Sequence, residues 1–93
     1  MTDDERLSAL KIDLGIVATE YDSRLTSYLK TAKEEIEREG ATLDLASDIA
    51  ENNLVIDYAA WMWRKRDTGE GMPRMVRYAL NNLILSQKGG SDE

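Results

Sequence analysis

The residues best suited to chemistry lie together in the stretch WMWRKRDTGEGMPRM at 61–75. Two tryptophans adjoin three consecutive cations, Arg64, Lys65 and Arg66. Proteins that bind single-stranded nucleic acids combine such aromatic and basic side chains, for base stacking and for phosphate attraction. The same cations also suit the end of a helix, where free carbonyls and the helix dipole favour positive charge. Both interpretations stay open from these residues alone.

Catalytic, metal and phosphate sites find less support. The segment TGEGMP lacks the G-x-x-x-x-G-K-[ST] pattern of a phosphate loop, and no strand precedes it. Glu34, Glu35 and Glu37 point in different directions around a helix, so their carboxylates do not converge on a cation. The chain has no cysteine and no histidine, which removes thiol nucleophiles, Cys/His zinc sites and histidine acid–base chemistry. We therefore expect no enzymatic activity, no cofactor and no metal.

A protein contact is the third interpretation of the stretch. Trp61 and Trp63 lie two residues apart, about 200° around a helix, so they face nearly opposite sides. One can enter the core while the other stays exposed, unless the bundle absorbs both. Tryptophan, methionine and arginine are enriched at protein interfaces. The residues expected near subunit or partner contacts are Trp61, Trp63, Arg64, Lys65, Arg66, Met72, Pro73, Met75 and Arg77.

Four helices must position these residues. Apolar side chains recur every three or four residues in the segments 3–14, 20–39, 47–66 and 73–87. The third segment is apolar on most sides, which is typical of a central helix. No segment alternates with the period of a strand. The predicted fold is all-α, a compact bundle of four helices with short connections and no sheet.

Local signals mark where these helices begin and end. Thr2 or Asp3 can cap the first helix, and Gly15 can stop it. Pro73 suits the first turn of the last helix, where its missing N–H costs nothing. The third helix is expected to start from a cap at Ser47 or Asp44. The expected core-facing stripes of the last two helices include Ala50, Met75 and Ala79.

Length and composition limit the number of domains and the class of protein. The 93 residues allow one domain, with little margin of burial unless the chain oligomerises. The content of 42% hydrophobic and 32% charged residues favours a globular chain. No apolar run approaches the ~18 residues of a membrane span, and the acidic start does not resemble a secretory signal. We expect a single domain at 1–88 and a flexible tail at 89–93.

Charge is distributed unevenly around the net value of −6. Residues 1–57 carry 6 basic and 14 acidic side chains, whereas residues 58–88 carry 6 basic and 2 acidic ones. This asymmetry could attract a nucleic acid. It could equally let the basic end of one copy meet the acidic face of the next.

Taken in order, the segments resemble the small head–tail connector (head-completion or adaptor) proteins of tailed bacteriophages and prophages, over about residues 7–85. The resemblance rests on the pattern YD..L..YL..A in the second helix, on LV.DYAAWMWRKR in the third, and on GMPRMVRYALNN leading the last. It implies an all-helical, non-enzymatic virion protein, made in the host cytoplasm and placed at the neck. It further implies a ring of identical subunits beneath the portal protein, which extends the DNA channel without binding DNA tightly and docks the next neck or tail component.

Two hypotheses follow for the basic run at 64–66. In a ring, it would pair with carboxylates of the adjacent copy, such as Glu34, Glu35 or Glu39. In the alternative, the chain is a small helical regulatory or nucleic-acid-binding protein that uses Arg64, Lys65 and Arg66 against phosphates. The number of subunits in a ring stays open at this point.

Overall fold

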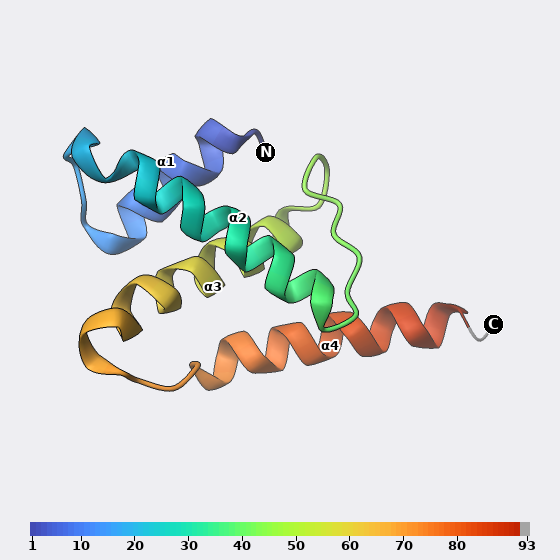
Figure 1. The fold of residues 1–93 in the computed structure, drawn as a ribbon. Coiled ribbons are helices and arrows are strands. Elements are labelled where there is room, and N and C mark those ends of the chain that lie inside the picture. Colours follow the sequence, from blue (N-terminus) through green and yellow to red (C-terminus); the bar gives the residue numbers. More distant parts are fainter. Residues whose placement is uncertain (92–93) are drawn as a thin grey trace.

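The computed structural model describes residues 1–91, with side chains through Lys88, and this part of the chain is helical without any strand (Figure 1). One short 3-10 turn precedes the second of four α-helices. The prediction of an all-α fold is therefore confirmed. The elements are α1 (Asp3–Leu14), η1 (Thr19–Tyr21), α2 (Asp22–Arg38), α3 (Ile49–Thr68) and α4 (Arg74–Ser91).

Helix α3 is central, as its apolar composition predicted, and it packs against α1, α2 and α4. Its widest contact is with α2, and both helices bury small side chains, Ala32 in α2 and Ala59 and Ala60 in α3. Figure 1 shows α4 along the lower edge of the molecule, with its C-terminal part reaching past the other helices. The largest fully buried apolar side chains are Leu10, Leu25, Ile36, Val55 and Leu80.

Helix α1 begins and ends where the sequence predicts. The Thr2 hydroxyl accepts a hydrogen bond from the Glu5 amide at 3.2 Å, and the Glu5 carboxylate accepts one from the Thr2 amide at 2.7 Å. This reciprocal capping box satisfies two backbone donors that the first turn leaves free. Gly15 ends the helix in the left-handed region, at φ 72°, where glycine carries no steric cost.

The predicted cap of α3 is wrong. The carboxylate of Asp48, not a side chain of Ser47 or Asp44, accepts a hydrogen bond from the Glu51 amide at 3.0 Å. The helix begins one residue later than a Ser47 cap would require, at Ile49. The Asp44 backbone amide instead donates to the Glu51 carboxylate, so the loop folds onto the first turn of α3.

Helix α4 starts as predicted and runs longer. The Pro73 carbonyl accepts hydrogen bonds from the amides of Val76 and Arg77, both at 3.1 Å. The helix continues to Ser91, beyond the predicted end at 87. The first three residues of the expected tail at 89–93 are thus helical, and the last two lie outside the described residues. Flexibility of this tail stays a prediction.

The orientation of α4 differs from the expected stripe. Val76 and Leu80 are buried against the core, but Met75 and Ala79 are exposed. Adjacent residues lie about 100° apart on a helix, and the side of α4 that faces the core is centred on Val76 and Leu80, which leaves Met75 and Ala79 in solvent. Ala50 is also exposed, whereas Asn52 in the same turn of α3 is fully buried.

Polar contacts fix α4 along its length. Arg77 forms an ion pair with Glu39 at the end of α2, at 2.7 Å. Ten residues further along, the Gln87 side chain accepts from the Thr42 amide at 2.8 Å and donates to the Thr42 carbonyl at 2.7 Å. The Gln87 side chain thus satisfies both backbone groups of Thr42 and attaches α4 to the 41–48 loop.

Candidate assembly surfaces

The C-terminal turns of α3 bring together the aromatic and basic residues that the sequence singles out. Trp63 meets Tyr21 and Tyr28 edge-on, with ring centres 5.6 Å and 5.9 Å apart. The guanidinium carbon of Arg66 lies 3.8 Å from the centre of the Trp63 ring. A cation over the face of tryptophan is attracted by the negative potential of the ring. One tryptophan therefore joins η1, α2 and α3.

Trp61 lies in a second cluster. Its ring meets Tyr58 edge-on at 5.4 Å, and the Lys65 ammonium lies 4.3 Å from its centre. Its indole nitrogen donates to the Glu70 carbonyl at 3.1 Å, which ties the α3–α4 connection to the helix. Both tryptophans are half-buried and have partners within the chain. The expectation that one would stay exposed is wrong, and the alternative, in which the bundle absorbs both, describes the fold.

These contacts occupy two of the three cations in the basic run. Lys65 and Arg66 cover tryptophan rings from the next turn of the same helix, at the i,i+4 and i,i+3 spacings that bring side chains together. All three cations, Arg64, Lys65 and Arg66, are exposed, so each remains accessible to solvent although two of them lie over tryptophan rings.

The remaining predicted contact residues differ in exposure. Arg77 is half-buried in its pair with Glu39, which raises the pKa of its guanidinium. Met72 is half-buried against the core. Pro73 is exposed, and 76% of Met75 is accessible to solvent. Among these four, only Pro73 and Met75 offer substantial free surface.

An exposed apolar surface lies on the outer face of α4, and the sequence analysis selected only Met75 of its three residues. Met75, Tyr78 and Leu85 are 76%, 64% and 67% exposed, and their spacing of three and seven residues aligns them on one side of the helix. That side is opposite to Val76 and Leu80. We call these three residues the α4 stripe. Its signal in the sequence is a second apolar periodicity, offset from the core-facing one.

A groove lies between the start of α1, the middle of α2 and the 41–48 loop. Its volume is about 260 Å³, and its floor is apolar, formed by Leu7, Leu29, Leu45 and Val55. Polar side chains border it, namely Asp3, Asp4, Arg6, Thr26, Lys30 and Lys33. We call it the α1–α2 groove. An apolar floor with a polar border can receive an amphipathic side chain.

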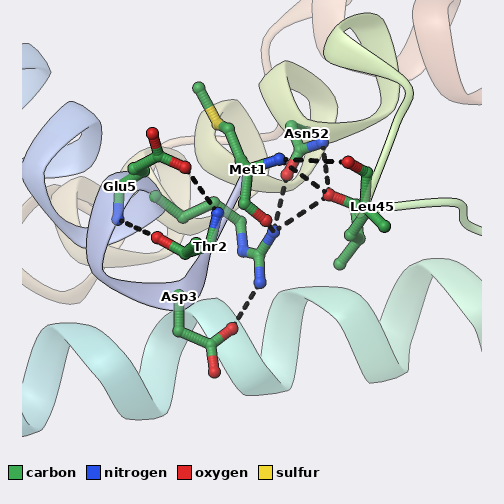
Figure 2. A network of polar contacts seen from close by, with 8 residues as sticks. Met1, Thr2, Asp3, Glu5, Leu45 and Asn52 are labelled. Carbon is green, nitrogen blue, oxygen red and sulfur yellow. Dashed lines mark hydrogen bonds and ion pairs between the residues drawn. The ribbon is translucent and has the colours of Figure 1, made fainter.

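A buried polar network holds one wall of this groove (Figure 2). Arg6 is almost fully buried and donates to the Asn52 side chain at 2.7 Å and to the carbonyls of Met1 and Leu45, and it also pairs with Asp3. Asn52 is fully buried and donates to the Leu45 carbonyl at 2.9 Å. Figure 2 shows the Leu45 carbonyl where these donors meet. The loop is thereby attached to α1 and α3. The sequence analysis did not predict this network. Its signal in the sequence is the presence of Arg6 and Asn52 on the apolar faces of their helices.

A protein-family model described as Phage gp6-like head-tail connector protein matches residues 4–89, nearly the whole chain. The chain belongs to this family. No curated protein and no solved structure matches it. Family membership makes this connector a structural phage protein and implies contacts with other head and tail proteins at the neck of the virion. The resemblance noted in the sequence is thus confirmed.

The carboxylates considered as partners in an adjacent connector subunit are partly engaged within the chain. Glu35 pairs with Arg38 at 2.7 Å, and Glu39 pairs with Arg77 at the same distance. Glu34 is exposed. An intersubunit role for Glu35 or Glu39 would therefore have to share or replace an existing ion pair.

Among the described residues, no group of three or more Asp or Glu side chains could hold a metal ion. Within the same part of the chain, no helix is long and apolar enough to cross a membrane.

Proposed function

We propose that the connector assembles into a ring of identical subunits beneath the portal protein, where it extends the DNA channel and docks the next neck or tail component. A ring requires a heterologous interface, in which each subunit offers two different surfaces to its two neighbours. The presence of an exposed apolar stripe on α4 and an apolar groove elsewhere on the same chain supports this proposal. A symmetric dimer would need only one self-complementary surface.

The distribution of charge also supports a head-to-tail contact. No acidic side chain occurs from residue 71 to residue 91, whereas the first 57 residues are strongly acidic. Complementary charges steer subunits into the correct orientation, and like charges oppose the wrong one. The basic end of one subunit is thus suited to the acidic part of the next.

Native mass spectrometry tests the proposal, on the purified chain alone and mixed with the portal protein of the same phage. We expect a closed oligomer of defined mass, free or bound to the portal. A strict monomer that ignores the portal would contradict the proposed ring. Because only the subunit mass is needed to interpret the spectrum, the measurement also gives the number of subunits.

DNA is proposed to pass through this ring without tight binding. Neutralising several phosphates with Lys or Arg is what makes DNA affinity high and dependent on salt. The chain has a net charge of −6, and the exposed cations Lys65 and Arg66 each already lie over a tryptophan ring. These features favour a sliding surface over the alternative role as a nucleic-acid-binding protein.

A further inference from the structure

We propose that the α4 stripe of one subunit docks into the α1–α2 groove of a second copy of the same chain. The inference rests on the proposed ring and names the two surfaces that would close it. Tyr78, at the centre of the helix's exposed face, would enter the groove. Met75 and Leu85 would pack on either side.

The stripe is the exposed side of a helix that is otherwise well anchored. From Met75 to Leu85 it extends about 15 Å along the axis, at 1.5 Å per residue. Val76 and Leu80 hold the opposite side in the core, and the Arg77–Glu39 and Gln87–Thr42 contacts fix its direction. A rigid helix loses little conformational entropy on docking, which favours affinity.

The groove is likewise preformed. Its loop wall is held by the contacts of Arg6 and Asn52 with the Leu45 carbonyl, so it does not have to form on binding. Its apolar floor suits an aromatic ring, and Thr26 and Lys30 at its border can hydrogen-bond the hydroxyl of Tyr78. The stripe points away from the core of its own chain. It therefore cannot reach the groove of the same subunit, which leaves the groove to a neighbour.

A single ion pair can form across this contact, at the acidic corner of a groove whose border also carries Lys30 and Lys33. Arg74 lies one turn before Tyr78 on α4, and Asp4 borders the groove. Both are exposed, and neither forms an ion pair with another of the described residues. Docking would bring them near each other in adjacent copies. Packing of one stripe against another would place no carboxylate near Arg74, because α4 carries no acidic side chain.

The test uses two variants of the full chain that each disable one surface. Tyr78→Asp puts a charge into the stripe, and Thr26→Arg puts a long side chain across the groove. Both positions are exposed, so the fold is expected to persist. We expect each variant to weaken self-association by about thirtyfold or more, as is typical of a central aromatic contact. Sedimentation velocity over a concentration series measures this.

Two matched controls test whether the effect belongs to these surfaces. Ile12→Asp introduces the same charge at an apolar side chain that is 79% exposed on α1. Ser27→Arg adds the same side chain one residue along α2, outside the groove. Both are expected to assemble like the wild type. Equal weakening by a control and its matched variant would overturn the assignment.

A mixture of the two variants gives the decisive outcome. Tyr78→Asp keeps an intact groove, and Thr26→Arg keeps an intact stripe, so together they form one productive contact. We expect a 1:1 heterodimer that grows no further. If Thr26→Arg alone assembled normally, or the mixture gave no heterodimer, the stripe would not use the groove.

Further outcomes separate this inference from the proposed function. If rings still formed with both variants, the docking mode would fail while the ring would stand. If Tyr78→Asp lost binding to the portal but kept its self-association, the stripe would belong to the portal contact and the inference would fail. A wild-type chain that stayed monomeric with and without the portal would overturn both.

Discussion

The guanidinium of Arg66 lies over the indole face of Trp63, 3.8 Å from the ring centre. From the sequence, Arg66 was a candidate for phosphate binding and Trp63 a candidate for an exposed interface. In the structure the two side chains pack against each other on α3. Tyr28 meets the same ring from α2. The pair is therefore part of the junction between two helices.

We expect Arg66→Ala to lower the free energy of unfolding by about 0.5–1 kcal/mol, the usual range for a cation–π contact at an accessible site. Urea denaturation followed by tryptophan fluorescence measures it, at matched protein concentration because association stabilises the folded state. Arg64→Ala is the control and should change stability by less than about 0.5 kcal/mol. Equal losses in the two variants would show that the ring contact adds nothing.

Asn52→Leu should lower the free energy of unfolding by more than Arg66→Ala does. It removes the acceptor of Arg6 and the donor to the carbonyls of Leu45 and Asp48, all in a buried site. Leaving such groups without partners costs about 1–3 kcal/mol. The adjacent Asn53 is exposed, so Asn53→Leu is a matched control with a small expected effect. Denaturant midpoints compare the two, and an unchanged midpoint for Asn52→Leu would mean that the network does not stabilise the loop.

Asp57 gives the chain a predictable pH response. Partial desolvation of the Asp57 carboxylate by neighbouring protein atoms, and then the negative charge of Asp13, raise the pKa of Asp57 above its usual value of 3.8. The folded state therefore holds this proton more tightly than the unfolded state, so the Asp57 contribution to stability falls as pH rises through the interval between the two pKa values. Solvent screens the group, since Asp57 is exposed.

We expect Asp57→Asn to stabilise the fold at neutral pH by roughly 0.5 kcal/mol, an amount typical of surface substitutions. The gain should disappear at a pH below the ordinary carboxyl pKa, where Asp57 is protonated in both states. Thermal denaturation at several pH values follows it. A gain that was constant from neutral to acid pH would rule out ionisation of Asp57 as its cause.

The isolated protein should not shift duplex DNA in a mobility assay at an ionic strength of about 0.15 M. Its net charge is −6, which opposes binding to the phosphates of DNA. A clear shift that weakened steeply with added salt would instead favour the nucleic-acid-binding alternative. The Arg64→Ala variant would then show how much this cation contributes.

The helices were predictable because their signals are local. Thr2 with Glu5, Gly15 and Pro73 act through backbone groups only a few residues away. The cap of α3 was predicted wrongly because Asp44, Ser47 and Asp48 are all good capping residues within five positions. Which of them caps depends on how the loop folds back, and the Asp44–Glu51 hydrogen bond is part of that arrangement.

The candidate surfaces were only partly predictable. The sequence predicted subunit or partner contacts for the stretch at 61–75, which stays a prediction, and the structure shows that its tryptophans contact the chain itself. Tyr78 and Leu85 were not selected, because an apolar residue on a helix does not by itself reveal which face the helix buries. The α4 stripe is exposed because α4 turns Val76 and Leu80, on its other side, toward the core.

The sequence by itself determined the helical class, the family and the absence of cysteine and histidine chemistry, because periodicity, order and composition need no contact information. Only the tertiary structure decided that Lys65 and Arg66 cover indole rings, and that Arg6 meets Asn52 from 46 residues away. It also decided that the α4 stripe faces solvent while the α1–α2 groove lies open elsewhere. These outcomes depend on which helix faces meet, and that choice is made by the packing of the whole chain.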